Sequence, residues 1–406
     1  MTKANSSATH RPADRLSGIA LSEIVQISER ARQMRAEGRD VIALSTGEPD
    51  FPTPPEVIEV AHQAALAGQT RYTPTAGTPD LRAEVARLAG TDPANVIIST
   101  GAKQVLANTM LATLNPGDEV IMPAPFWTSY ADIVRMAGGT PVVLPCPVSQ
   151  NFKLTPEQLA DAITPQTRWL MLNSPSNPSG AIYTAEEYAQ LADVLDAHPQ
   201  VWVVADEIYE HLSYTPFTSF AKAAPHLRDR TLIVNGVSKA WSMTGWRIGW
   251  GIGPAALIRD MTSVQGQITS GASSVSQAAA IAALQTDPQI LEDRRAIFRA
   301  RRDTTIDGLS AIPGLTCPAP DGAFYAFPDC SELIEGRFDN DAALCQWLLE
   351  ETGVALVPGR AFGMPGHVRL SFAYAESQIR EALTRMKTAI DRLTSAPSAA
   401  FADHTG

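Results

Sequence analysis

The chain has little of what would mark it as a secreted, membrane or metal-binding protein. Its four cysteines in 406 residues form no Cys-x-x-Cys pair and no Cys/His group with the spacing of a zinc site. Because so few thiols do not suggest a disulfide scaffold, they favour a reducing compartment. No run of about 18 apolar residues is present, and the first 15 residues lack the apolar core of a signal peptide. The sequence therefore predicts a cytoplasmic protein without a metal site.

Positive charge is also scarce. The chain has 32 Lys and Arg against 43 Asp and Glu, which gives a formal charge of −11. This balance argues against nucleic-acid or anionic-membrane partners, although a local pocket can still bind a small anion. The 45% hydrophobic and 18% charged content is ordinary for a globular protein, and the length allows a large domain and a smaller one.

Seven short apolar segments alternate with helical patterns in the first two thirds of the chain. Near-continuous apolar strands suit a sheet buried on both faces, so we predict an α/β fold with a mostly parallel, doubly wound sheet. One of the helices between the strands is expected at 184–197. The segments are NVIIST at 95, DEVIMP at 118, TPVVLP at 140, TRWLMLN at 167, QVWVVAD at 200, TLIVNG at 231 and RIGWGIG at 247.

From about Thr286 the pattern changes to a long charged helix, strand-like segments such as GAFYAFPD, VALVPG and HVRLSFA, and a closing helix. This predicts a smaller α+β domain, with which a first helix at 23–37 is expected to pack. The predicted domains are a small one from residues 15–48 and 286–394, a large one from 49–285, and flexible ends at 1–14 and 395–406.

Three segments bring together unusual chemistry. SKAWSMTGWRIGW at 238–250, NSPSNPSG at 173–180 and VVADEIYE at 203–210 supply an amine, an amide, a carboxylate, a phenol and a guanidinium. Pyridoxal phosphate needs a lysine to bond its aldehyde, an acid for its pyridine nitrogen and donors for its phosphate. Each segment includes or follows the carboxyl end of a predicted strand. Ligands bind at the carboxyl ends of the strands in doubly wound sheets. The three segments therefore predict a pyridoxal phosphate site.

Ten motifs in order support a family resemblance from about Leu16 to Leu393. By them the sequence resembles the class I aminotransferases of the aspartate aminotransferase family, which are fold-type I pyridoxal phosphate enzymes, and especially their bacterial aspartate/prephenate branch. The motifs are LSTGEPDFPTP, TRYTPTAGTPDLR, STGAKQVL, PGDEVIMPAPFWTSY, NSPSNPSG, ADEIYEHL, VNGVSKAWSMTGWRIGW, DGAFYAF, VALVPGRAFG and HVRLSFA.

The resemblance implies roles around the cofactor. Lys239 matches the lysine that bonds the aldehyde, and Asp206 matches the acid that pairs with the pyridine nitrogen. Tyr209 and Asn177 match the residues that hydrogen-bond the phenolic oxygen. Some relatives have a serine or threonine at Gly236, so one phosphate contact is expected to be missing. The ring and phosphate would be held by Trp127, Ser238, Arg247 and the backbone of Gly101, Ala102 and Lys103.

The resemblance also implies a substrate site. Arg369 matches the arginine that clamps the substrate's α-carboxylate, beside Asn177, Trp127 and the backbone of Gly47. The second arginine that some relatives use for a distal carboxylate has no counterpart in 263–277. Lys103 is expected to take that role. A shorter connection than in relatives, ARLAGTDPAN, leaves the shape of the entrance open.

The resemblance further implies a homodimer with shared active sites, because Tyr72 matches a tyrosine that reaches the neighbouring subunit's phosphate. Several of these residues also have ordinary structural readings. Lys239 and Lys103 can face solvent, Asp206 can cap a helix, and Arg369 can lie on an exposed strand. Asn177 and Tyr72 can belong to turns, while Trp127 and Tyr209 can be core residues.

The predicted function is amino-group transfer from an L-amino acid, first of all aspartate, to 2-oxoglutarate by a ping-pong mechanism. Lys239, Asp206 and Tyr209 are the predicted catalytic residues. Aromatic, alanine or basic donors stay open, and so does a lyase on the same fold, because one carbanion feeds several outcomes. A non-enzymatic regulator is disfavoured, since the chain has no basic N-terminal extension for a DNA-binding module.

Overall fold

The structure is a computed structural model that describes residues 11, 13–16, 19 and 23–395. Most of the two ends predicted to be flexible, residues 1–14 and 395–406, lies outside the described residues. Among the residues that are described, no helix combines the length and apolarity needed to cross a bilayer.

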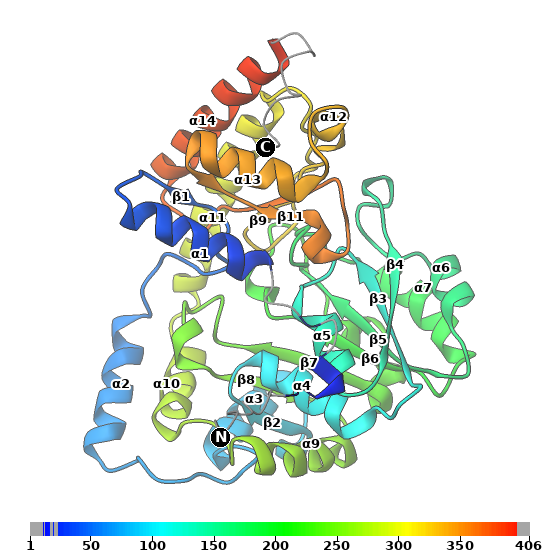
Figure 1. The fold of residues 1–406 in the computed structure, drawn as a ribbon. Helices are drawn as coiled ribbons and strands as arrows, with labels where there is room; N and C mark the ends of the chain where they lie inside the picture. Colours follow the sequence, from blue (N-terminus) through cyan, green and yellow to red (C-terminus); the bar gives the residue numbers. More distant parts are fainter. Residues whose placement is uncertain (1–10, 12, 17–18, 20–22, 396–406) are drawn as a thin grey trace, which may run out of the picture.

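A seven-stranded sheet forms the centre of the molecule (Figure 1). Its order is β2-β8-β7-β6-β5-β3-β4, and β8 runs antiparallel to both of its neighbours while the other pairs are parallel. Six of the seven strands fall within the predicted segments and β3 extends one residue beyond its segment, and the predicted mostly parallel fold is confirmed. The strands are β2 (Val96–Ser99), β3 (Glu119–Ala124), β4 (Thr140–Pro145), β5 (Thr167–Asn173), β6 (Trp202–Asp206), β7 (Thr231–Gly236) and β8 (Gly249–Ile252).

Helices cover both faces of this sheet. Side chains alternate between the two faces along each strand, so both faces carry apolar residues that the helices bury. In β3, Val120 and Met122 belong to the hydrophobic cluster of one face, whereas Ile121 belongs to that of the other. The first face holds α4 (Ala102–Thr113), α5 (Ser129–Met136) and α9 (Ala255–Ile268); the second holds α6 (Pro156–Ala162), α7 (Ala185–Asp196) and α8 (Phe220–Ala223). Around β2 and β8 lie α2 (Pro55–Leu66), α3 (Pro79–Ala89) and α10 (Ser274–Leu284).

Capping residues in the sequence determine where several helices begin. The Thr184 hydroxyl accepts the Glu187 N–H, and the Glu187 carboxylate accepts the Thr184 N–H. Such a capping box satisfies two amides that a helix start leaves free. The helix expected at 184–197 is therefore present as α7, and α6 begins in the same way at Thr155.

The C-terminal part forms a separate layer above the sheet in Figure 1. A three-stranded antiparallel sheet has the order β11-β12-β9, and β10 pairs in parallel with β1 (Ile42–Ala43) from the N-terminal region. The segment 354–359 thus forms two short strands with different partners. The elements are α1 (Glu23–Ala36), α11 (Gln289–Ser310), β9 (Tyr325–Ala326), α12 (Ser331–Ile334), α13 (Asp341–Thr352), β10 (Val354–Ala355), β11 (Val357–Pro358), β12 (Val368–Ser371) and α14 (Glu376–Ser395).

The two parts share a hydrophobic core at the end of β6. Ile208 and Leu212, which follow β6, cluster with Phe298 of α11 and with Phe324 and Leu370 of the C-terminal part. The carboxyl ends of the central strands therefore face the C-terminal layer. The predicted domain boundaries, residues 15–48 with 286–394 against 49–285, stay a prediction.

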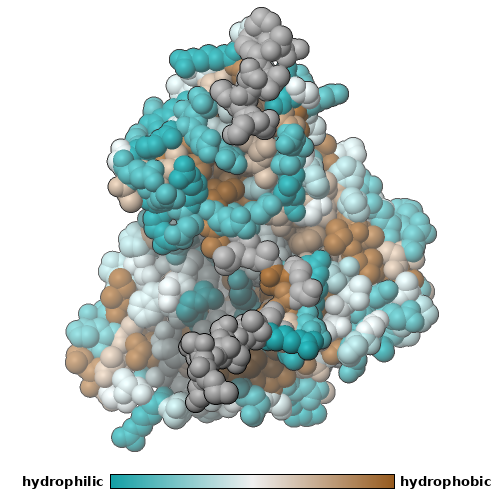
Figure 2. Space-filling model, in the orientation of Figure 1, coloured by the Kyte–Doolittle hydropathy of each residue, from teal (hydrophilic) through white to brown (hydrophobic). Residues whose placement is uncertain are grey.

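The surface side shown in Figure 2 is mostly hydrophilic, with hydrophobic patches between the polar side chains. Several exposed hydrophobic residues lie on α2, where Leu66 is 69% exposed and Ile58 is 47% exposed. Tyr72, in the loop between α2 and α3, is 95% exposed. A tyrosine so open to solvent makes almost no packing contribution to the core of this chain.

Candidate active site

One cavity of about 380 Å³ lies where the sheet meets the C-terminal layer. Eleven of the thirteen residues predicted to form the site line it; Gly101 precedes the lining residue Ala102, and Tyr72 does not line it. The lining residues are Thr46, Gly47, Glu48, Ala102, Lys103, Trp127, Tyr130, Asn173, Asn177, Asp206, Ile208, Tyr209, Ser238, Lys239, Thr244, Arg247, Tyr325 and Arg369.

Lys239 lies just beyond the end of β7 and points its amine into the cavity. Its Nζ donates to the Gly47 carbonyl oxygen at 2.6 Å. Burial, with the nearby Arg369 charge as the next cause, lowers the pKa of Lys239 to about 8. Lys239 is thus no solvent-facing lysine after a strand. The fraction of this amine that is uncharged near neutral pH is therefore far larger than for an ordinary lysine, and the uncharged form is the nucleophile.

Asp206 is the last residue of β6, and it is buried. Its Oδ2 accepts the Tyr130 hydroxyl at 2.7 Å, and its Oδ1 accepts the Ile208 N–H at 3.2 Å. Burial raises the pKa of Asp206 to about 6, and the Tyr130 hydrogen bond opposes that rise. Asp206 does not cap a helix: the next helical turn begins at Glu210, with Tyr209 as its N-cap. The carboxylate is therefore available to pair with a ligand group in the cavity.

Arg369 is 2% exposed, so it does not lie on an exposed strand. Its Nη1 donates to Asn177 Oδ1 at 2.9 Å, and its Nη2 donates to the Ser45 carbonyl oxygen at 2.6 Å. Its buried Nε has no hydrogen-bond partner among the described residues. A buried guanidinium that has an unpaired donor and forms no ion pair within the described part of the chain is suited to bind an anionic ligand.

The start of α4 packs against β8 and Arg247. A Cβ on Gly249 would lie 2.3 Å from the Ala102 nitrogen, and one on Gly101 would lie 2.5 Å from Arg247 Nη2. Only glycine allows this approach, which gathers the first amides of a twelve-residue helix, the guanidinium and the nearby Ser238. A Cβ on Gly236 would lie 2.8 Å from the Ile248 carbonyl oxygen, so a larger residue does not fit there.

Lys103 and Trp127 form one wall of the cavity. Lys103 is exposed, yet its Nζ lies 4.7 Å from the centre of the Trp127 ring, within cation–π range. Partial desolvation of the amine at the cavity wall, and then the Arg247 charge, lower the pKa of Lys103. Trp127 is half-buried and meets Tyr130 edge to face.

The charge of the lining is opposite to that of the chain. The chain carries −11, whereas the described residues that line the cavity include four cationic side chains and two anionic ones. Such a lining favours small anions in a protein whose surface as a whole does not. The cations are Lys103, Lys239, Arg247 and Arg369, and the anions are Glu48 and Asp206.

Sequence reasoning missed two tyrosines of the site. Tyr130 donates to Asp206, and the hydroxyl oxygens of Tyr325 and Tyr209 lie 2.9 Å apart. Both lie within motifs that carry the resemblance, PFWTSY and DGAFYAF. Sequence spacing could not reveal their partners, which are 76 and 116 positions away.

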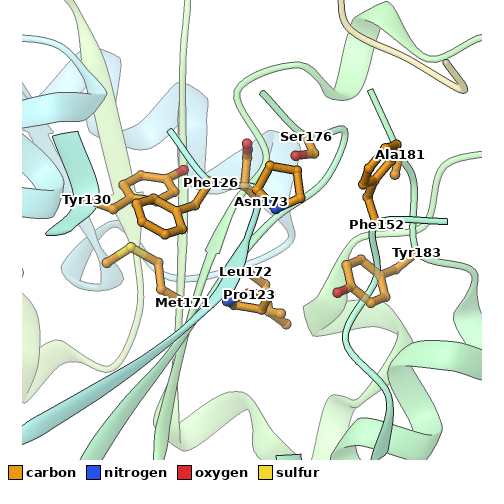
Figure 3. A pocket seen from close by; sticks show the side chains of 11 residues that line it. Pro123, Phe126, Tyr130, Phe152, Met171, Leu172, Asn173, Ser176, Ala181 and Tyr183 are labelled. Atoms are coloured by element: carbon orange, nitrogen blue, oxygen red, sulfur yellow. The ribbon is translucent and has the colours of Figure 1, made fainter. Parts of the chain in front are cut away.

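A second, smaller cavity of about 20 Å³ shares part of its lining with the first, and its residues are shown in Figure 3. Tyr130 and Asn173 line both cavities, while Phe152 and Tyr183 line the far side of the small one. This volume is enough for about one water molecule. The buried Tyr130–Asp206 pair therefore has little room for solvent behind it.

Comparisons with known proteins agree with these observations. Residues 39–386 match the family described as aminotransferase class I and II. The chain is 47% identical over 401 residues to an aspartate aminotransferase of Rhizobium meliloti, covering 95% of this chain and 98% of that protein. It is also 47% identical over 389 residues to an aspartate/prephenate aminotransferase of Cereibacter sphaeroides, covering 92% and 97%.

Solved structures show the same likeness. The aspartate aminotransferase from Rhizobium meliloti matches with a TM-score of 0.91 at 47% identity, covering 95% of this chain and 100% of that one. The aspartate aminotransferase from Thermus thermophilus with maleate matches with a TM-score of 0.88 at 39% identity, covering 94% and 100%.

Proposed function

We propose that this chain, which belongs to the class I and II aminotransferase family, transfers the amino group of L-aspartate to 2-oxoglutarate. Its cofactor is the family's pyridoxal phosphate, and its fold is fold-type I. The observation that carries the proposal is the Lys239 amine, with its pKa lowered to about 8, in one cavity with the buried Asp206 and Arg369. The relatives' names favour aspartate as the amino donor.

The side chains of the cavity fit the cofactor. Lys239 supplies an amine for its aldehyde, Asp206 a buried carboxylate for its pyridine nitrogen, and Tyr209 and Asn177 donors for its phenolic oxygen. The start of α4, Ser238 and Arg247 form an anion site for its phosphate, and Trp127 offers a flat ring for stacking. When bound, pyridoxal phosphate supplies an electron sink that delocalises the charge left on the substrate's α-carbon.

The chain's own residues perform the proton and binding steps. Lys239 Nζ removes the α-proton and later returns a proton, and a pKa near 8 allows both directions near neutral pH. Asp206, ionised above about pH 6, would keep a proton on the cofactor's pyridine nitrogen. Arg369 Nε and the other guanidinium donors fix the substrate carboxylate, so that the α-carbon hydrogen faces Lys239. Amino donor and 2-oxo acceptor use this site in turn.

Preference for an acidic substrate is supported by Lys103. The segment 263–277 has no arginine, and the Lys103 ammonium is the remaining cation of the lining that is not assigned to cofactor, proton transfer or α-carboxylate. Its position over Trp127 on the cavity wall suits a distal carboxylate.

We further propose that the protein is a homodimer and that it is located in the cytoplasm. Tyr72 is 95% exposed and does not line the cavity of its own subunit, which agrees with a role at the partner's phosphate site. The exposed hydrophobic residues on α2 suit a covered face. All four cysteines are free thiols, as expected in a reducing compartment.

The test is a single half-reaction. Purified protein is mixed with L-aspartate, L-glutamate, L-alanine, L-phenylalanine or L-arginine without any oxo acid, and the cofactor's absorption is followed. We expect conversion of the aldehyde form to the amine form, fastest with the two acidic donors. Faster conversion with another donor would overturn the substrate, and pyruvate with ammonia released instead would indicate a lyase. A protein without a cofactor band would contradict the proposal as a whole.

A further inference from the structure

Tyr325 of β9 contacts three residues of the site that come from three separate segments. It is 1% exposed and lines the cavity. Its hydroxyl oxygen lies 2.9 Å from that of Tyr209, which follows β6. Its ring lies 4.6 Å from the guanidinium carbon of Arg369, and a Cβ on Gly47 would lie 2.5 Å from its hydroxyl oxygen. A single side chain thus contacts both the cofactor side and the substrate side of the cavity.

The hydrogen bond between the two tyrosines has a defined direction once the cofactor is bound. Each phenol has one proton to donate. When Tyr209 donates its proton to the cofactor's phenolic oxygen, the bond to Tyr325 forms only if Tyr325 donates to Tyr209. Among the described residues Tyr209 is the hydrogen-bond partner found for this hydroxyl, and Gly47 packs closely against it. A donor behind Tyr209 makes Tyr209 itself a stronger donor.

The ring of Tyr325 acts separately from its hydroxyl. The Arg369 guanidinium carbon lies 4.6 Å from the centre of the Tyr325 ring and 4.9 Å from the centre of the Phe362 ring. These two rings restrict the plane of the guanidinium without using any of its N–H donors. Nε has no hydrogen-bond partner among the described residues. Replacing Tyr325 by Phe removes only the hydroxyl, whereas replacing it by Leu removes the ring as well.

We propose that Tyr325 is a positioning residue with two separable roles: its hydroxyl fixes Tyr209 as a donor to the cofactor's phenolic oxygen, and its ring orients Arg369 for the substrate carboxylate. The inference rests on the proposed function, because it needs a cofactor with a phenolic oxygen in this cavity. The competing explanation is that Tyr325 only fills the hydrophobic core to which it belongs.

The hydroxyl is tested by a pH titration of the cofactor's absorption in the holoprotein, without substrate. Donation to the phenolic oxygen stabilises its anion and so lowers the pKa of the absorption change. We expect Tyr209→Phe to raise that pKa most. Tyr325→Phe should raise it by roughly 0.5 to 1, the equivalent of one ordinary hydrogen bond. The control is Tyr214→Phe, which removes a buried hydroxyl bonded to the Ala323 carbonyl oxygen outside the cavity; it should leave the pKa unchanged.

The ring is tested by steady-state kinetics with L-aspartate. Tyr325→Leu should raise KM by roughly 3- to 30-fold, as expected for loss of a partly buried cation–π contact, whereas Tyr325→Phe should leave KM near that of the wild type. If Tyr325→Phe behaves like Tyr214→Phe in the titration, the inference is overturned while the proposed function stands. An unchanged pKa in Tyr209→Phe would overturn it too. If the wild type shows no cofactor absorption, both fail together.

Discussion

At the scale of single residues, Asp206 and Lys239 set two separate lower pH limits on cofactor capture. Burial raises the pKa of Asp206 to about 6, so its carboxylate is ionised above that pH. Burial lowers the pKa of Lys239 to about 8, so its amine is mostly neutral only above that pH. Capture of an aldehyde with a protonated pyridine nitrogen needs both conditions. For protein stripped of cofactor, the rate constant with pyridoxal phosphate should rise in two steps, with midpoints near pH 6 and pH 8.

A substitution at Tyr130 distinguishes the Asp206 step from the Lys239 step. Its hydrogen bond to Oδ2 lowers the pKa of Asp206, so Tyr130→Phe should move the lower step to higher pH. The shift should be roughly one to two pH units, as expected for a hydrogen bond to a charged group. The upper step, set by Lys239, should stay in place. Stopped-flow absorbance between pH 5 and 10 measures both steps.

The matched control is Tyr183→Phe, on the opposite wall of the small cavity (Figure 3). The Tyr183 hydroxyl accepts the Leu154 N–H and does not contact Asp206. This variant should leave both steps unchanged. A lower step that does not move in Tyr130→Phe would mean that Tyr130 does not hold the carboxylate in its ionised form.

Lys103 provides a test of substrate choice at the same scale. Lys103→Ala should lower kcat/KM for L-aspartate by roughly 10- to 100-fold, as for loss of one partly desolvated charge contact. The value for L-alanine, which has no distal carboxylate, should stay within about twofold. Steady-state rates with both donors give this ratio, and an equal loss for both would assign Lys103 to cofactor binding instead.

At the scale of secondary-structure elements, the contact between β8 and α4 sets the geometry of the predicted phosphate site. A Cβ at Gly249 would lie 2.3 Å from the Ala102 nitrogen, so Gly249→Ala must displace the start of α4. We expect a loss of about 1–3 kcal/mol in the free energy of unfolding, as for overpacking a core. The Kd for pyridoxal phosphate should rise by roughly tenfold or more, because the helix amides and Arg247 move apart.

The control for this contact is Gly245→Ala, four residues away. Gly245 is exposed, and a Cβ there would meet nothing within 4 Å. Both variants are compared by thermal unfolding and by fluorescence titration with pyridoxal phosphate. Equal affinity in the two would show that the start of α4 does not bind the phosphate.

The same elements show which parts of the fold and site can be predicted from sequence. Strands such as β6 and β7 are buried along almost their whole length, so their continuous apolar sequence predicts them. The polar residues at the ends of these strands can then be placed at the edge of the sheet where ligands bind. The Tyr130–Asp206 and Tyr209–Tyr325 contacts join elements far apart in the chain, and no periodic pattern encodes them. The split of 354–359 into β10 and β11 was equally hidden, because each strand takes its partner from a different region.

At the scale of the whole molecule, the proposed dimer predicts that two inactive variants restore each other. Lys239→Ala removes the amine of one site, and Tyr72→Ala removes a side chain that is 95% exposed in its own subunit. If Tyr72 acts across the interface, a hybrid dimer has one site with both defects and one site with neither. Random exchange makes half of the dimers hybrid, so about one quarter of all sites should be intact.

The experiment mixes the two purified variants under conditions that allow subunit exchange, and then measures turnover with L-aspartate and 2-oxoglutarate. We expect the mixture to recover up to about a quarter of wild-type activity, well above the sum of the separate variants. Mixing Lys239→Ala with Arg369→Ala is the control: both residues line the same subunit's cavity, so a hybrid has one defect in each site and should stay inactive. A Tyr72 mixture that also stays inactive, although exchange is demonstrated, would mean that each subunit's site is complete without its partner's tyrosine.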